Sequence, residues 1–343
     1  MRYALLIAPS SNRVYAGEAP RLTEAELAVF GEAVLGARPR NLGVEQLGGV
    51  PYVVFEVDSP LTDRDIAYLS NVSTAYALFA REGDLLRPVP LTPLARYDDD
   101  LLTILKYPGK TNEQFTQLLL NVTVLASRWA DQMLERRLVV LDPLCGRGTT
   151  LNQALRYGYD AIGIEIDGGH VDAYSAFLRT WLRRKRIKHT VELNPVRHHG
   201  KRVARRLTAE LAPTKEAYRE KDLQHVTVFH ADAVASRQLL RPGCCDVIVT
   251  DAPYGVAHGS RAATGLSRRP LELLAAAVPG WVELLRHGGA LGVSFNVHVA
   301  DRAEVADLLT AAGLELVTTP AYQRFAHWVD QGITRDLLVA TKP

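Results

Sequence analysis

The chain has 343 residues, of which 47% are hydrophobic, and its 40 lysines and arginines nearly balance its 38 acidic residues. This composition is typical of a folded globular protein and excludes a largely disordered chain, and any attraction to a polyanion must come from local clusters of basic residues. The three cysteines, Cys145, Cys244 and Cys245, form no C-x-x-C pair, which favours a reducing compartment and argues against a disulfide framework or a bound metal. The apolar runs are too short for a signal peptide or a membrane span, so we expect a cytoplasmic protein.

The first 95 residues predict a small α+β domain. Its predicted elements are a strand at 3–8, a helix opened by the capping-box pattern of Thr23 and Glu26 and ending near 37, strands at 44–47 and 52–57 joined at Gly48-Gly49, a helix capped by Thr62 and Asp65, and a strand at 74–81. The order βαββαβ is that of a ferredoxin-like domain, which we interpret as a candidate RNA-recognition module.

A proline-rich stretch, RPVPLTP at 87–93, follows this unit. Because proline fixes its own backbone and lacks an N–H, the stretch predicts a stiff connector rather than a helix or an inner strand. We therefore expect two domains, at residues 1–95 and 96–343.

From about residue 111 the sequence predicts strands that alternate with helices, which is typical of a parallel sheet covered on both faces. The strand candidates are 138–141, 161–165, 226–229, 246–249 and 290–295, with a closing pair at 315–317 and 336–340. The fold class is thus α/β, with a Rossmann-like sheet in the larger domain.

The segment LDPLCGRGTTL at 141–151 lies between a predicted strand and a predicted helix. Gly146 and Gly148 let the backbone approach a ligand, and the helix N-terminus can bind an anionic group. A dinucleotide-binding loop would carry a third glycine where this chain has Leu151. Asp142 would repel a pyrophosphate but attract a cation, so S-adenosylmethionine, which has an ammonium and a carboxylate but no phosphate, suits the loop better.

Two further acids follow predicted strands. Glu165 stands at the distance from the glycines that is expected of a ribose-binding carboxylate, which serves either cofactor. Asp232 follows the next strand, where it can receive the amino group of adenine. A single acid at such a position is usually a helix cap or a solvated loop residue, but three of them behind one glycine loop favour a cofactor site.

The stretch TDAPYGVAHG at 250–259 follows the buried strand DVIV, so Asp251 to Tyr254 should lie at the carboxyl end of the sheet, where open α/β sheets bind ligands. By itself D-x-P-Y could equally be a turn that ends a strand. Its position after the glycine loop, in the correct strand order, favours a catalytic role.

Taken together, these motifs resemble those of class I S-adenosylmethionine-dependent methyltransferases that act on exocyclic amines. The nearest likeness is to the THUMP-linked tRNA guanine-N2 methyltransferases, over roughly residues 110–343, with YPGKTNEQFTQLLLNV at 107–122 resembling the segment that flanks their cofactor. The family usually has Asp-Pro-Pro-Tyr where this chain has Ala252, and 95 residues leave little room for a full THUMP domain.

The resemblance implies specific roles. Asp251 would accept one hydrogen of the amine, the carbonyl of Pro253 the other, and Tyr254 would stack on an extruded base. The implied cofactor-binding residues are Asp142, Pro143, Cys145, Gly146, Gly148, Thr149, Glu165, Asp232 and Asp251. A nucleophilic role for Cys145 is disfavoured, because it lies in the cofactor loop without a paired histidine.

A basic insertion at about 179–222 separates the second and third strands of the larger domain, and its residues 179–206 include eleven Lys or Arg and the single acid Glu192. Apolar spacing predicts one helix through Val171 and Trp181 and another through Val203 and Leu211. The basic faces would be solvated surface in an ordinary protein, but beside a base-methylating site we expect phosphate contacts. The candidate nucleic-acid contacts, including one from the loop at 255–270, are Arg183, Arg184, Lys185, Arg186, Arg202, Arg205, Arg206 and Arg261.

These observations predict an enzyme that methylates an exocyclic amino group in nucleic acid, with guanine N2 in tRNA or other structured RNA as the expected target. A DNA adenine-N6 or cytosine-N4 methyltransferase is the first alternative, although no long target-recognition domain follows D-x-P-Y. The second is an RNA-binding protein that binds the cofactor without catalysis.

Overall fold

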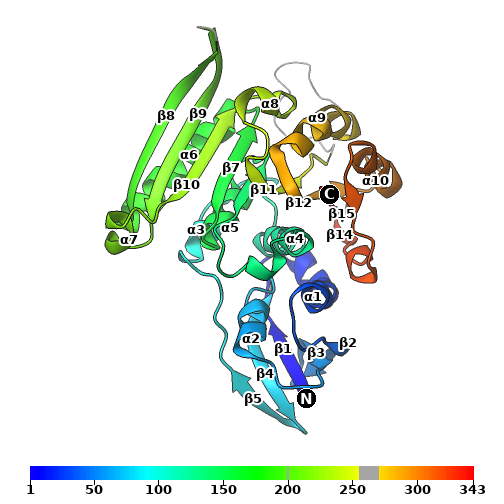
Figure 1. Ribbon diagram of the computed structural model, residues 1–343. Coiled ribbons are helices and arrows are strands. Elements are labelled where there is room, and N and C mark those ends of the chain that lie inside the picture. The colour runs from blue at the N-terminus through cyan, green and yellow to red at the C-terminus, as the bar shows by residue number, and fades with distance from the viewer. Residues whose placement is uncertain (199–200, 255–269) are drawn as a thin grey trace.

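The structure is a computed structural model, and it describes residues 1–198, 201–254 and 270–343. Two sheets, one of five and one of ten strands, are joined by the segment at 90–99. Figure 1 shows the small sheet below and the large sheet above.

The small sheet belongs to the N-terminal unit and is antiparallel, with the strand order β2-β3-β1-β4-β5. Its elements are β1 (Arg2–Ile7), α1 (Arg13–Ala33), β2 (Arg40–Leu47), β3 (Val50–Glu56), α2 (Asp63–Leu69), β4 (Ala75–Glu82) and β5 (Leu85–Val89). The first six follow the predicted order βαββαβ, and the ferredoxin-like assignment itself stays a prediction. Gly48 and Gly49 make the predicted turn, with φ of +58° and +84°, which a two-residue hairpin loop of this kind requires.

Two local predictions in this unit are wrong. Helix α1 begins ten residues earlier than its supposed capping box, because Asn12 caps it by accepting hydrogen bonds from the N–H groups of Val14 and Tyr15. Thr23 and Glu26 instead lie inside the helix and are fully buried, so their spacing reflects a shared helix face rather than a helix start.

The proline-rich stretch begins as a strand rather than as a connector. Residues up to Val89 form β5, which pairs with β4 at the edge of the sheet. Proline is tolerated at a sheet edge, because the missing N–H of Pro88 need not serve a second neighbouring strand.

The large sheet has the order β13-β15-β12-β11-β6-β7-β10-β9-β8, and β14 pairs with β15. Its central strands are parallel, and β15 is antiparallel to β12. The strands are β6 (Val139–Asp142), β7 (Asp160–Glu165), β8 (Lys188–His198), β9 (Lys201–Ala212), β10 (Gln224–His230), β11 (Cys245–Asp251), β12 (Leu285–Asn296), β13 (Glu315–Leu316), β14 (His327–Asp330) and β15 (Ile333–Thr341). This is the Rossmann-like arrangement that the alternating pattern predicts.

Helices cover both faces of the large sheet. They are α3 (Asp100–Thr103), α4 (Glu113–Ala126), α5 (Thr149–Arg156), α6 (Gly168–Arg184), α7 (Lys215–Arg219), α8 (Ser236–Leu239), α9 (Pro270–Leu284) and α10 (Arg302–Ala311), with short 3₁₀ turns η1 (Ala130–Gln132), η2 (Ala233–Ala235) and η3 (Pro320–Gln323). The strands that follow β6 in the chain are added first on one side of it, as β7 and β10, and then on its other side, as β11 and β12. The order of the strands therefore reverses beside β6. Open α/β sheets bind ligands in the crevice at such a reversal.

The second helix predicted in the basic insertion is wrong, because β8 and β9 form a long antiparallel hairpin there. Positions 203, 207 and 211 are four residues apart. Residues at this spacing share one face of a helix, and they also share one face of a strand because strand side chains alternate with a period of two. Leu207, Ala209 and Leu211 are buried in the alternation of a strand. Pro195 lies in β8, an edge strand, where proline is tolerated.

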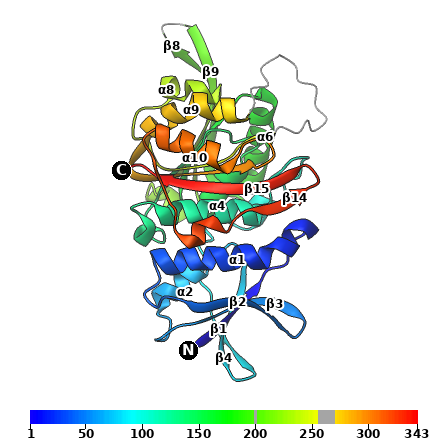
Figure 2. The ribbon, with the colours of Figure 1, turned by 90° about the vertical axis from the view of Figure 1, so that its right-hand side faces the viewer.

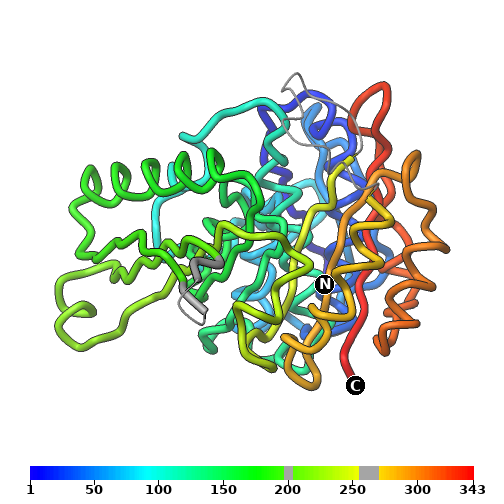
Figure 3. Tube along the Cα trace, turned by 90° about the horizontal axis from the view of Figure 1, so that it is seen from above, coloured from blue at the N-terminus to red at the C-terminus, as the bar shows by residue number. Residues whose placement is uncertain are grey.

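One hydrophobic cluster continues from the small sheet into the large one. Helix α1 packs against α4, η3 and β14, as Figure 2 shows. Viewed from above in Figure 3, the β8–β9 hairpin and β15 lie at opposite ends of the large sheet. The predicted division near residue 95 therefore does not coincide with a gap in the core.

Candidate active site

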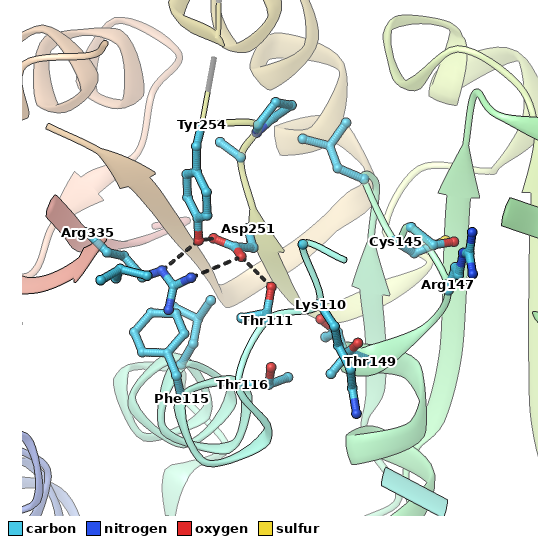
Figure 4. Close-up of a pocket in the computed structure, with 18 of the residues that line it drawn as sticks. Lys110, Thr111, Phe115, Thr116, Cys145, Arg147, Thr149, Asp251, Tyr254 and Arg335 are labelled. Atoms are coloured by element: carbon cyan, nitrogen blue, oxygen red, sulfur yellow. Dashed lines mark hydrogen bonds and ion pairs between the residues drawn. The ribbon is translucent and has the colours of Figure 1, made fainter. Parts of the chain in front are cut away.

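Two adjoining cavities lie at the carboxyl ends of β6, β7 and β11, with volumes of about 530 and 350 Å³. Leu144, Asp251 and Pro253 line both of them. The glycine loop and the Asp251–Tyr254 segment, predicted separately from the sequence, thus meet at one place. Figure 4 shows the larger cavity.

The loop between β6 and α5 requires its glycines. Gly146 and Gly148 have φ of +52° and +83°, in the left-handed region that side chains disfavour. A Cβ at Gly148 would also come within 2.5 Å of the ring of Tyr174. The N–H of Gly148 donates to the carbonyl of Cys145 at 2.7 Å, which closes the tight turn that presents the loop to the larger cavity.

Asp142 is 3% exposed and lines the larger cavity. Its Oδ1 accepts hydrogen bonds from the N–H of Leu144 at 3.1 Å and from the hydroxyl of Thr250 at 3.0 Å. Burial raises the pKa of Asp142 to about 7, since these neutral partners only partly offset the loss of water. A cation in the cavity would find a buried carboxyl group there.

Glu165 and Asp232 both line the smaller cavity, together with Pro143 and Ile166. Glu165 accepts hydrogen bonds from the N–H groups of Gly146 at 2.8 Å and of Asp167 at 2.7 Å, and burial raises its pKa. Asp232 caps η2 by accepting from the N–H of Val234 at 2.9 Å. Asp232 is therefore a cap, as a lone acid usually is, and also a cavity residue.

Hydroxyl groups from three elements converge on Asp251. Thr111, in the loop before α4, donates to Oδ2 at 2.6 Å, while Ser294 of β12 and Tyr254 donate to Oδ1. Asp251 is nevertheless partly exposed to both cavities. The carboxylate is thus held in one orientation at the junction of the two cavities.

Ala252, which stands where the resembled motif usually has proline, has a partner that proline would lack. The N–H of Ala252 donates to the carbonyl of Ser294 at 2.9 Å, and the side chain of Ala252 is buried. The side chain of Asn296 donates to the carbonyl of Tyr254 at 3.3 Å. Backbone hydrogen bonds therefore fix the turn that a second proline would otherwise stiffen.

Arg335 of β15 is a member of the site that the sequence analysis missed. Its side chain is 5% exposed, and its guanidinium lies over the rings of Phe115, at 4.2 Å, and Tyr254, at 5.1 Å. Figure 4 shows it directed at Tyr254 and Asp251. A charged residue inside the apolar strand ITRDLLVA was the available signal, because a buried charge needs a partner.

The outer wall of the larger cavity comes from the segment before α4. The hydroxyls of Tyr107 and Thr149 lie 3.1 Å apart, and the guanidinium of Arg147 lies 4.8 Å over the ring of Tyr107. Cys145 lines the cavity, and burial raises the pKa of its thiol, which disfavours the thiolate that a nucleophile requires. The Nε atom of Arg147 is buried and has no hydrogen-bond partner among the described residues.

The predicted basic contacts do not form one surface beside this site. Helix α6 starts at the carboxyl end of β7 and runs in the opposite direction to that strand. Arg183, Arg184 and Arg186 therefore lie toward the amino ends of the parallel strands, away from the cavities. Lys185 pairs there with Asp98 and Asp100.

Residues where β8 ends and β9 begins lie closer to the carboxyl ends of the parallel strands, where the two cavities are. Arg205 pairs with Asp172 at 3.0 Å, whereas Arg206 is exposed. The side chain of Arg202 and the whole of Arg261 lie outside the described residues. Figure 1 shows the hairpin rising past the carboxyl ends of β7 and β10.

Within the part of the chain that the structure describes, no group of three or more His, Cys, Asp or Glu could hold a metal ion. No described helix is long and apolar enough to cross a membrane.

No family model matches the chain, and no curated protein matches it. Solved structures that are similar to this chain include a TehB-like S-adenosylmethionine-dependent methyltransferase from Corynebacterium glutamicum, with 15% identity, 63% of this chain and 86% of that chain covered, and a TM-score of 0.34. Precorrin-6y C5,15-methyltransferase from Geobacter metallireducens has 13% identity, covers 73% and 99% and has a TM-score of 0.39. Magnesium protoporphyrin IX methyltransferase from Synechocystis, solved with S-adenosylmethionine bound, has 15% identity, covers 71% and 90% and has a TM-score of 0.39. At such low sequence identities and TM-scores, these similarities assign no activity to this chain.

Proposed function

We propose that the chain is an S-adenosylmethionine-dependent methyltransferase that acts on an exocyclic amino group of a nucleic-acid base. The observation that carries this proposal is the position of Asp251 at the junction of two cavities. The residues proposed for the cofactor line both cavities, and the larger cavity also contains Tyr254, beside which a target amine could reach Asp251.

The residues around the junction suit S-adenosylmethionine in their chemistry. Asp142 can bind its ammonium group, and the unpartnered Nε of Arg147 and the start of α5 can bind its carboxylate. Each oxygen of Glu165 accepts one hydrogen bond and has a second lone pair for a ribose hydroxyl. Asp232 and the apolar Ile166 line the part of the smaller cavity where adenine would lie.

The cofactor supplies an electrophilic methyl group bound to a sulfonium. Asp251 and the carbonyl of Pro253 would each accept one N–H of the target amine, which directs the nitrogen lone pair toward the methyl carbon. As the N–C bond forms and the S–C bond breaks, positive charge moves to the nitrogen, where Asp251 stabilises it and then accepts the released proton. S-adenosylhomocysteine and the methylated base are the products.

The target that we propose is guanine N2 in tRNA or another structured RNA. The D-x-P-Y motif and its resemblance to tRNA guanine-N2 methyltransferases support this choice, as does the basic hairpin near the carboxyl ends of the parallel strands. The larger cavity is of a size that holds a small planar group, so an extruded base can enter it.

The test is to incubate the protein with methyl-labelled S-adenosylmethionine and with total RNA or total DNA, and then to identify the methylated nucleoside by mass spectrometry. N2-methylguanosine in RNA is the expected product. N6-methyladenine or N4-methylcytosine in DNA would instead identify the DNA enzyme, and cofactor binding without methylation of either would leave a non-catalytic binding protein.

The catalytic assignment is tested by Asp251→Asn. The amide cannot carry the negative charge, so we expect methyl transfer to fall by about 10²-fold to 10⁴-fold. Thermal stability and affinity for S-adenosylhomocysteine, measured on the same preparation, should stay near those of the wild type. Near-normal transfer by a folded variant would contradict the assignment.

A further inference from the structure

Arg335 has an unusual setting for a buried cation. Its closest carboxylate oxygen, Oδ2 of Asp251, lies 3.9 Å from Nη2, which is too far for a hydrogen bond. Its Nε instead donates to the phenol oxygen of Tyr254 at 2.5 Å. A guanidinium that served only to neutralise Asp251 would be expected to form a bidentate pair with it.

The hydrogen bond from Arg335 fixes the direction of the hydroxyl of Tyr254. Arginine has no acceptor atom, so the phenol oxygen must accept at this contact. The single phenol proton is then directed to Oδ1 of Asp251, the other partner of this hydroxyl. A relay of donors therefore runs from Arg335 through Tyr254 to Asp251.

This relay determines which oxygen of Asp251 is open. A carboxylate has about four acceptor sites. Oδ1 accepts from Ser294 and Tyr254, and Oδ2 accepts only from Thr111 among the described residues. The remaining acceptor site is on Oδ2, so this is the oxygen offered to a target amine.

Arg335 also fixes the ring of Tyr254. The guanidinium lies 4.2 Å over the ring of Phe115 and 5.1 Å from the ring centroid of Tyr254, so attraction to the π-system of Phe115 supports its position beside the hydroxyl of Tyr254. Tyr254 also lines the larger cavity, so the contact with Arg335 holds this ring in place there.

We infer that Arg335 is a positioning residue for methyl transfer, which orients Tyr254 as a donor to Oδ1 and thereby reserves Oδ2 for the target amine. This role rests on the proposed function. Arg335 itself need not touch the target, because it acts through the hydroxyl and the ring of Tyr254.

The first test needs no substrate. In protein labelled with ¹³C at tyrosine Cζ, the resonance of Tyr254, assigned with Tyr254→Phe, should shift in Arg335→Met and in Arg335→Lys, because both lose the Nε–H donor. Arg302→Met is the matched control, since Arg302 pairs with the neighbouring strand residue Asp336 and lines neither cavity. An unchanged Tyr254 resonance in both Arg335 variants would overturn the inference.

The second test uses the RNA or DNA that the wild-type protein methylates. Arg335→Met should lower kcat by about 10-fold to 100-fold through misplacement of the acceptor, with the affinity for S-adenosylhomocysteine unchanged. In a Tyr254→Phe background the same substitution should have a much smaller effect, because the relay is already broken.

Additive losses in that double-mutant cycle would show that Arg335 acts independently of Tyr254 and would refute the relay. Absence of methylation by the wild-type protein would contradict the proposed function, while the tyrosine resonance would still report on Arg335. If Arg335→Met fails to fold, Arg335→Lys keeps the charge and carries both measurements.

Discussion

Glu26 is a buried carboxyl group whose hydrogen-bond partners are neutral. Its oxygens accept from the N–H and hydroxyl of Ser73 and from the amide of Asn121, and burial raises its pKa from 4.5 to about 7. The folded state therefore binds this proton more tightly than the unfolded state does. The resulting stability is fully present below about pH 4.5 and is lost as the pH rises through 7.

Glu26→Gln removes this titration and keeps the shape of the side chain. We expect the variant to match the wild type near pH 4 and to exceed its free energy of unfolding at pH 8 by an amount on the order of 3 kcal/mol. Thermal or denaturant unfolding between pH 4 and pH 8 measures the difference. Asp142 titrates in the same direction, so both proteins should retain part of the slope. A variant that is less stable than the wild type at pH 8 would contradict the expectation.

Glu165 is the residue at which the cofactor assignment is most directly tested. In Glu165→Gln an amide N–H faces one of the two backbone N–H groups that the carboxylate now accepts from. We expect the affinity for S-adenosylhomocysteine to weaken by about 1–3 kcal/mol, as measured by calorimetry. Asp172→Asn, which changes an acid outside both cavities, is the control. Preferential binding of NAD by the wild type would overturn the assignment.

For single residues, the sequence predicted the site members that belong to a motif. It missed the members that lie far from the motifs in sequence and contact the site only in the folded chain. Asp142 and Asp251 lie where the strand ends predict them. Thr111, Ser294 and Arg335 reach Asp251 from elements far apart in the chain, and only the folded sheet brings them together. Motif spacing carries no information about such partners, although the buried charge of Arg335 was visible as an anomaly.

Among the elements, the β8–β9 hairpin has the clearest consequence for the proposed nucleic-acid binding. Because β10 is parallel to β7 and β9 is antiparallel to β10, the end of β8 and the start of β9 lie at the carboxyl ends of the parallel strands, where the two cavities are. Residues 195–205 have the sequence PVRHHGKRVAR, with four Lys or Arg and no acid. The basic C-terminal end of α6 lies toward the amino ends of the parallel strands. The basic residues of 195–205 and those at the end of α6 can therefore be tested separately.

Replacing residues 195–205 by Asn-Gly would join β8 to β9 with a two-residue turn and leave the pairing of β9 with β10 largely intact. We expect weaker binding to bulk RNA and a shallower dependence on salt, since about one counterion is released for each lost phosphate contact. Arg183→Ala, Arg184→Ala and Arg186→Ala together provide the comparison toward the amino ends of the parallel strands. A larger change in the salt slope from the triple variant would place the contact there instead.

The helix that was predicted here shows why elements are harder to infer than sites. A period of four is compatible with both regular structures, and only pairing with β10, which is distant in sequence, selects the strand. The strand β11 lies between two parallel neighbours and is buried on both faces. Its sequence is therefore a continuous apolar run, which distinguishes it from a helix with one apolar face.

For the whole molecule, the continuous core between the two sheets predicts one unfolding transition. Leu22 of α1 is fully buried in the cluster that also contains Leu118 of α4 and Phe325. We expect calorimetry to show a single peak, and Leu22→Ala to move the whole peak down, with a loss of about 2–5 kcal/mol. Two peaks, of which only one moves, would instead establish residues 1–95 as an independent domain.

Asp251 and Pro253 line both cavities, so a molecule in either cavity would contact the same two residues. Under the proposed function, if the cofactor tightens binding of the target through these residues by a given factor, the target would tighten binding of the cofactor by the same factor. Methyl transfer changes both molecules at this junction, so the factor for the two products would differ from the factor for the two substrates. The order of product release would then depend on the transferred methyl group, without a separate gate.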